Sequence, residues 1–192
     1  MAELNYSIDL DLKEVKAMVD NLVPYIYEDE LYGKINMDSA RLTPGSIILR
    51  LRRLGALRSQ MNEAQAVQYE KLKAQNESVL KEWNVAYGKK MVKEAESRLR
   101  DLQTYIKECR EDAKICANAY NPEALRRTIV AEIMAALPAG VDATALKSSV
   151  SAVDGGLRRN IRETPFIWAQ TLQSAYPQDT FWWLYGRPPQ PD

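Results

Sequence analysis

Apolar residues recur with the period of an α-helix through the middle of the chain, and this repeat constrains the fold more than any other feature. From Tyr69 to Tyr120, fourteen steps of three or four residues cover 51 positions, a mean of about 3.6 residues per step. The stripe consists of Tyr69, Leu72, Asn76, Val79, Trp83, Tyr87, Met91, Ala95, Leu99, Leu102, Ile106, Cys109, Ala113, Cys116 and Tyr120. This spacing predicts one long central helix, over about residues 60–120.

The length of this helix bears on assembly. Residues 69–120 would extend roughly 78 Å at about 1.5 Å per residue. The rest of the chain is too short to cover the whole stripe, so we expect another copy of the chain or another protein to bury part of it. Gly88 could end a helix and make the region a hairpin, but the stripe keeps its phase across this glycine. Continuity through Gly88 is therefore the prediction.

Capping signals place two helices before the stripe. Ser7 or Asp9 can begin a helix that continues to Tyr27, and Pro24 should kink or split it. Thr43, followed by a proline at the first helical position, predicts the start of a second helix.

Two further helices are expected after the stripe. Asn121 followed by Pro122 should end the long helix and begin the next one. Asp142 can cap another helix, which we expect to end before the Gly155-Gly156 pair.

The signals together predict an all-α fold, a helical bundle built around the long central helix. We expect residues 1–163 to form a helical domain. Residues 164–192 are rich in aromatic residues and proline, and we expect this C-terminal segment to pack on the core or on a partner.

The composition argues against most enzyme classes. The chain has no histidine, which excludes Ser-His-Asp catalysis and every zinc site with a histidine ligand. Glycine-rich phosphate loops are absent, and no carboxylate lies on the stripe, where a metal site inside a bundle would need one. We therefore predict a non-enzymatic protein that needs no metal and no cofactor.

Cysteine content and hydropathy indicate in which cellular compartment the protein is expected. No apolar run approaches the roughly 20 residues that span a bilayer, and the N-terminus lacks the pattern of a signal peptide. Cys109 and Cys116 would lie about 10.5 Å apart along one helix, too far for a bridge within it, and are expected to act as small core residues. A disulfide to another subunit stays open in an oxidising setting. The prediction is a cytoplasmic protein without a transmembrane segment.

The C-terminal aromatic cluster is the first candidate for partner binding. Aromatic side chains and arginine are enriched at interface hot spots, and a Pro-Pro sequence stiffens the tail that follows. The candidate partner-binding residues are Phe181, Trp182, Trp183, Tyr185, Arg187 and Pro188. The alternative is that this segment folds back and closes one end of the helical core.

An arginine cluster is the second candidate. Residues 1–40 carry three basic and nine acidic side chains, whereas residues 41–60 carry five arginines and no acid. Arg50, Arg52, Arg53 and Arg58 could contact an anionic partner such as a nucleic-acid backbone. The alternative is that the acidic and basic regions neutralise one another within the fold.

The function predicted is that of a helical protein-protein interaction protein: an adaptor, an assembly factor or a structural subunit of a larger complex. Its partner would be another protein or another copy of the chain. The alternative function is a small helical subunit that contacts nucleic acid through its arginines.

Overall fold

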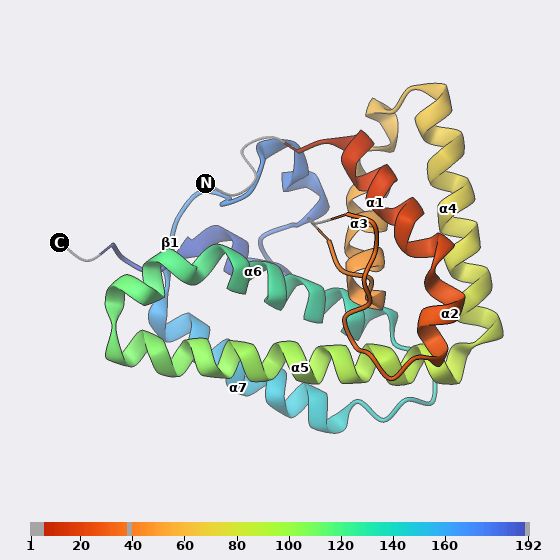
Figure 1. The fold of residues 1–192 in the computed structure, drawn as a ribbon. Coiled ribbons are helices and arrows are strands. Elements are labelled where there is room, and N and C mark those ends of the chain that lie inside the picture. The colour runs from red at the N-terminus through yellow and green to blue at the C-terminus, as the bar shows by residue number, and fades with distance from the viewer. Residues whose placement is uncertain (1–5, 38–39, 191–192) are drawn as a thin grey trace. The chain divides into compact units, whose positions relative to one another are not determined.

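The computed structural model describes residues 6–37 and 40–190, and it confirms the all-α class (Figure 1). The α-helices are α1 (Ile8–Asp20), α2 (Leu22–Tyr27), α3 (Pro44–Ala56), α4 (Glu63–Glu82), α5 (Asn84–Glu111), α6 (Ala113–Ala136) and α7 (Thr144–Asn160). Short 3-10 helices are η1 (Arg58–Gln60), η2 (Gln170–Ala175) and η3 (Trp182–Tyr185). Strands β1 (Arg162–Glu163) and β2 (Gly186–Arg187) pair antiparallel. No helix of the described residues is long and apolar enough to cross a membrane.

The central stripe belongs to three helices, so the prediction of one helix over residues 60–120 is wrong. The chain breaks at Trp83, between α4 and α5, and again at Asp112, between α5 and α6. Asp112 Oδ1 accepts hydrogen bonds from the backbone N–H groups of Lys114 (2.7 Å) and Ile115 (3.2 Å), which favours a new helix start. Gly88, in contrast, lies inside α5 as predicted.

Most members of the stripe still lie on the buried face of their helix, although Ala113 is exposed. Fully or almost fully buried members include Tyr69 and Leu72 of α4, and Met91, Ala95, Leu99, Leu102 and Ile106 of α5. Periodicity predicts which face of a helix is buried. It does not detect a one-residue break that leaves the three-to-four-residue spacing of the apolar residues unchanged.

Two predicted helix ends are also wrong. Pro122 lies inside α6, where it is exposed while Tyr120 and Ala124 beside it are buried in the core. Helix α7 continues past Gly155-Gly156 to Asn160. A Cβ on Gly156 would lie 2.6 Å from Ile106 Cδ1, so this glycine allows close approach of a neighbouring side chain and does not end the helix.

The cap predictions fare better. Ser7 Oγ accepts a hydrogen bond from the Leu10 N–H (3.2 Å), and Thr43 Oγ1 accepts one from the Ser46 N–H (3.1 Å). The first helical segment is split as predicted, at Asn21 between α1 and α2. At α7 the N-cap is Ala143 and not Asp142 as predicted, although Asp142 Oδ1 accepts a 2.9 Å hydrogen bond from the Thr144 N–H just before the helix.

Contacts along the chain divide it into two compact units. Unit 2 comprises residues 7–94 and 132–141, and unit 1 comprises residues 95–131 and 142–190 together with Tyr6. Helices α5 and α6 each contribute one part to each unit.

In unit 2, α1 packs on both α3 and α4. The buried side chains that hold these helices together include Leu12, Val15, Met18, Ile47, Leu54, Tyr69 and Leu72. The Glu94 carboxylate is fully buried and accepts from Thr43 Oγ1 (2.6 Å) and from the Gly45 N–H (2.8 Å), so a charged side chain of α5 fixes the start of α3.

In unit 1, the end of α5 and the start of α6 form a hairpin that a disulfide links. Cys109 and Cys116 are bonded, with their Cα atoms 4.5 Å apart. The prediction that these cysteines are too distant to bridge is wrong because it assumed a single helix. Once the chain reverses at Asp112, the two stripe positions face one another.

Candidate functional site

The aromatic cluster near the C-terminus lies largely in the core of unit 1. Phe181 is 3% exposed and Trp183 is 1% exposed. Trp183 Nε1 donates a 2.9 Å hydrogen bond to Thr128 Oγ1, and Tyr120 Oη donates a 2.6 Å bond to the Trp183 carbonyl oxygen. Two residues of α6 therefore anchor the segment to the helices of its own chain.

A series of edge-to-face ring contacts extends this core. Trp168 contacts Tyr176, Tyr176 contacts Phe181 and Phe181 contacts Trp183, with ring centroids 5.0 to 5.5 Å apart. The guanidinium of Arg127, which pairs with Asp154 on α7, lies 4.0 Å from the centroid of the Trp183 ring. The arrangement is that of a packed interior.

The six residues predicted to bind a partner are thus in unlike environments. Phe181, Trp183 and Pro188 are buried within unit 1. Trp182 is partly exposed beneath the guanidinium of Arg158, which lies 3.8 Å from its ring centroid. Tyr185 is partly exposed and its hydroxyl donates to the Tyr176 carbonyl oxygen, while Arg187 is exposed.

The arginines of α3 lie beside carboxylates of unit 2. Arg50 Nε lies 2.5 Å from Glu14 Oε2 and 3.5 Å from Asp11 Oδ1, both on α1. Arg52 Nε lies 3.1 Å from Glu132 Oε1. These pairs offset much of the positive charge that the sequence places on α3.

The other two arginines of this cluster differ in exposure. Arg53 is buried, 3% exposed. Arg58, beyond the end of α3, is exposed and lies 3.2 Å from Glu70 of α4. The contact of these four arginines with an anionic partner stays a prediction.

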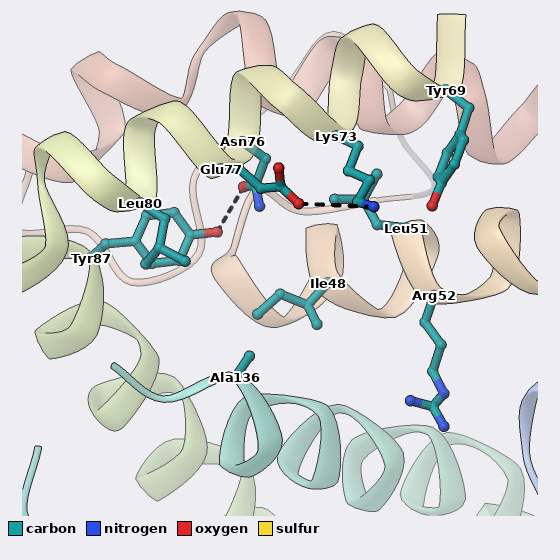
Figure 2. A pocket seen from close by; sticks show the side chains of 10 residues that line it. All are labelled: Ile48, Leu51, Arg52, Tyr69, Lys73, Asn76, Glu77, Leu80, Tyr87 and Ala136. Carbon is teal, nitrogen blue, oxygen red and sulfur yellow. Dashed lines mark hydrogen bonds and ion pairs between the residues drawn. The ribbon is translucent and has the colours of Figure 1, made fainter. Parts of the chain in front are cut away.

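A groove between α3 and α4 is the hollow of unit 2 that sequence reasoning missed (Figure 2). Its volume is about 350 Å³, within the range of specific ligand sites. It is lined by Ile48, Leu51 and Arg52 of α3, by Tyr69, Lys73, Asn76, Glu77 and Leu80 of α4, by Tyr87 of α5 and by Ala136 of α6. Figure 2 shows Leu51 of α3 beside Lys73 of α4, whereas Arg52 extends from α3 toward α6.

The walls of the groove are apolar and incompletely covered. Ile48, Leu51 and Leu80 are each partly exposed, although α1 buries the opposite sides of α3 and α4. An apolar stripe predicts one buried face for each helix, whereas α3 has Ile48 and Leu51, and α4 has Leu80, as partly exposed apolar side chains beside that face. The adjacent pairs Ile47-Ile48 and Val79-Leu80 are the sequence signal that such side chains exist.

Two tyrosines stand at the groove. Tyr87 Oη donates a 2.9 Å hydrogen bond to Asn76 Oδ1, and both residues are almost fully buried. Burial raises the pKa of Tyr87 well above its ordinary value, and burial likewise raises the pKa of Tyr69. Both phenols are therefore neutral hydrogen-bond donors at physiological pH.

The charged groups of the groove stand toward its rim. Lys73 Nζ and Glu77 Oε1 lie 4.0 Å apart, and their side chains are 46% and 62% exposed. The Glu132 carboxylate behind Arg52 is buried, and desolvation raises its pKa to about 7 although Arg52 and Arg53 oppose this shift. No group of three metal-ligating side chains converges anywhere in the part of the chain that the structure describes.

Comparisons with models of protein families, with curated proteins and with solved structures found no match to this chain.

Proposed function

We propose that this chain is a non-enzymatic interaction protein, and that the groove between α3 and α4 receives an amphipathic segment of a partner protein. The observation that carries the proposal is the cluster of Ile48, Leu51 and Leu80, three partly exposed apolar side chains gathered over a hollow of about 350 Å³. Apolar contact in a concave site is the usual source of affinity in helix-in-groove recognition.

The shape of the groove favours a chain segment. Its α4 wall runs from Tyr69 to Leu80, about 16 Å at about 1.5 Å per residue, which matches three turns of a bound helix. Lys73 on the α4 wall, with a side chain that is 46% exposed, suits an acidic residue beside the apolar face of that segment.

A protein partner is favoured over nucleic acid because of the ion pairs of the arginine cluster. A phosphate would have to compete with Glu14 for Arg50 and with Glu132 for Arg52. Within unit 1, the exposed part of the C-terminal cluster, namely Trp182, Tyr185 and Arg187, stays a separate candidate for partner contact.

The experiment compares two groove variants with a matched surface variant. Leu51→Glu and Leu80→Glu each place a carboxylate in the groove, and Val67→Glu makes the same kind of change on α4 at a side chain that is 65% exposed. The tagged full-length proteins are recovered from the cells that make the protein, with nuclease present, and circular dichroism checks that each is folded.

A stoichiometric protein is expected with the wild type and with V67E. Its recovery should fall at least tenfold with L51E and with L80E, because each carboxylate replaces an apolar contact and loses water when the partner binds, at a cost of about 1.4 kcal/mol or more. The interaction is then reconstituted from the purified proteins. Retention of the partner by both groove variants would rule out the groove, and a wild type that recovers no partner would remove the proposed function itself.

A further inference from the structure

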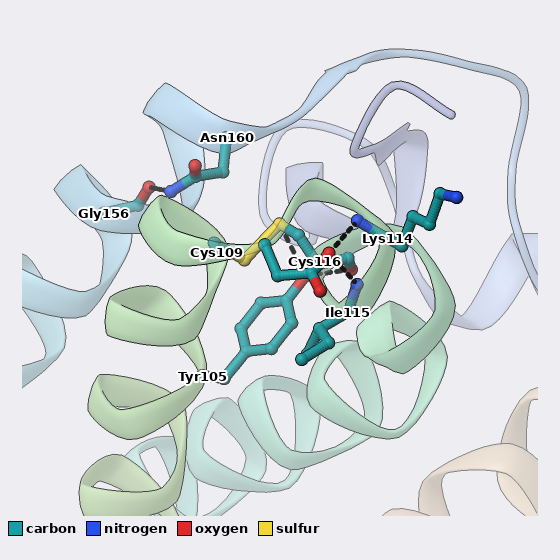
Figure 3. The surroundings of a disulfide bond; sticks show 8 residues. Tyr105, Cys109, Lys114, Ile115, Cys116, Gly156 and Asn160 are labelled. Carbon is teal, nitrogen blue, oxygen red and sulfur yellow. Dashed lines mark hydrogen bonds between the residues drawn. A yellow bond between two sulfur atoms is a disulfide. The ribbon is translucent and has the colours of Figure 1, made fainter. Parts of the chain in front are cut away.

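The disulfide between Cys109 and Cys116 lies at the surface of unit 1, at the turn between α5 and α6 (Figure 3). Cys109 belongs to the last turn of α5, and Cys116 belongs to the first turn of α6. The two ends of the bond are unequal, because Cys109 is partly exposed and Cys116 is only 3% exposed. An incoming reagent therefore meets the sulfur of Cys109 first.

A pocket of about 200 Å³ opens beside this bond. Its lining consists of Cys109, Ala113, Cys116, Arg159, Asn160, Arg162, Pro188 and Pro189. The volume suits a molecule of a few non-hydrogen atoms next to the sulfurs. The C-terminal segment supplies the two prolines, so this hollow lies where the aromatic cluster ends.

The pocket is positively charged. Arg159 and Arg162 are exposed, and among the residues that the structure describes no acidic side chain lines the pocket and none forms an ion pair with either arginine. Exposed cations without a carboxylate partner attract anions from solution over roughly the Debye length, about 10 Å at 0.1 M salt.

We propose that the Cys109–Cys116 disulfide is redox-active and exchanges with a small anionic thiol that enters the pocket beside Arg159 and Arg162. This inference concerns unit 1 and is independent of the groove in unit 2.

The exchange proceeds by two displacements at sulfur. The thiolate of the small thiol attacks Cys109 Sγ, a bond forms between these two sulfurs, and the bond between Cys109 and Cys116 breaks with its electron pair leaving on Cys116 Sγ. A second thiolate then attacks the small-molecule sulfur of the mixed disulfide and expels the Cys109 thiolate. In total, two small thiols are oxidised to their disulfide and the protein disulfide is reduced by two electrons.

Cys116 is the better leaving group of the two. Its Sγ lies 3.4 Å from the Tyr105 hydroxyl, which can donate a hydrogen bond to the thiolate as it forms. Burial raises the pKa of Tyr105, so this phenol keeps its proton and stays a donor. The first turn of α6 adds the partial positive charge of a helix start. With the disulfide closed, the same hydroxyl donates a 2.7 Å bond to the Cys116 carbonyl oxygen. Its single proton shifts from this oxygen toward the neighbouring sulfur as the thiolate forms.

The test uses three thiols of similar size and different charge on the folded full-length protein: 2-mercaptoethanesulfonate, 2-mercaptoethanol and cysteamine. The rate of disulfide opening is measured by quenching with an alkylating agent and by mass spectrometry. Each rate is divided by the rate for the same protein unfolded in urea, which removes the intrinsic reactivity of the thiol.

At low salt, the normalised rate should be highest for the anionic thiol and lowest for the cationic one, with about fivefold between successive charges. Charge reversal in R159E/R162E should invert this order. The matched variant R100E/K147E, which reverses two exposed charges outside the pocket, should keep the wild-type order. Added salt at about 0.5 M should bring the three rates together.

Brief reaction should leave the small thiol on Cys109 and the alkyl group on Cys116. A disulfide that opens only after the protein unfolds would show a purely structural bond and overturn the proposal. Equal normalised rates for the three thiols would do the same for the anionic specificity, and a mixed disulfide found on Cys116 would overturn the assigned direction of attack.

Discussion

The hydroxyl of Tyr87 donates a 2.9 Å hydrogen bond to Asn76 Oδ1, and this contact joins α5 to α4 across the break at Trp83. Both side chains come from the same stripe of the sequence, eleven residues apart. The break turns that spacing into a contact between two helices at the groove. This hydrogen bond explains how a polar residue, Asn76, can occupy a buried position of an otherwise apolar stripe.

Removal of this hydroxyl tests the contact. Tyr87→Phe should lower the free energy of unfolding by about 1 to 2 kcal/mol, because the buried Asn76 amide loses its partner. Tyr69→Phe is the matched control, since the Tyr69 hydroxyl forms no hydrogen bond to a residue among those described, and a smaller loss is expected. Urea unfolding followed by circular dichroism measures both. Equal losses would show that the hydrogen bond contributes nothing of its own.

Glu132 should make stability depend on pH. Its pKa is about 7 in the folded protein and 4.5 in the unfolded reference, so the folded state binds the proton more tightly. The stabilisation that protonated Glu132 contributes to the folded state is complete below pH 4.5. It declines as pH rises toward 7, because only the unfolded state ionises between these two pH values. Above pH 7 both states are ionised and the loss is constant.

The corresponding variant is Glu132→Gln, which removes the titration and keeps the shape. From pH 4.5 to pH 8, the wild type should lose about 1 to 3 kcal/mol of unfolding free energy relative to E132Q. Urea titrations at several pH values between these limits provide the measurement. A difference between the two proteins that stays constant with pH would show that Glu132 titrates normally in the folded state.

Two neighbouring tryptophans distinguish the core from the surface of the C-terminal segment. Trp183 is 1% exposed, so Trp183→Phe removes the hydrogen bond to Thr128 and leaves a cavity in the core. The free energy of unfolding should fall by about 2 to 3 kcal/mol. Trp182→Phe, on the partly exposed neighbour, should cost less than about 1 kcal/mol. Guanidinium unfolding followed by circular dichroism compares them. The reverse order would mean that the segment does not pack as described.

The turn between α5 and α6 depends on one carboxylate. Asp112→Ala removes the acceptor for the Lys114 and Ile115 N–H groups and should cost about 1 kcal/mol of unfolding free energy. Glu111→Ala, one residue earlier and also exposed, is the control and should be close to neutral. Thermal unfolding with the disulfide intact measures both, and an unaffected D112A protein would contradict the role of this cap.

The sequence was sufficient for the features that depend on local chemistry. Caps at Ser7 and Thr43 follow from a hydroxyl that precedes a helix and accepts from its first N–H groups. The buried faces of α4 and α5 follow from the spacing of their apolar side chains. These features involve residues within a few positions of one another, so they can be predicted from the local sequence alone.

The helix breaks and the groove depend on contacts between distant residues. Pro122 is tolerated within α6 because packing on both sides of it holds the helix, and Gly156 is required by Ile106, fifty residues away. The same local signals, proline and glycine, end helices elsewhere. The sequence did not predict the groove because partly exposed apolar residues and core residues look the same in a sequence. They differ only in which other parts of the chain pack against them.

The way the two compact units share the chain affects how a gene for this protein can be divided. Unit 2 consists of residues 7–94 and residues 132–141. Residues 95–131, which lie between these two stretches, and the residues after 141 belong to unit 1. No single cut in the reading frame yields a fragment that contains one unit complete and nothing of the other. A ribosome must release residue 141 before unit 2 has all its parts, so neither unit can finish folding as an independent N-terminal product.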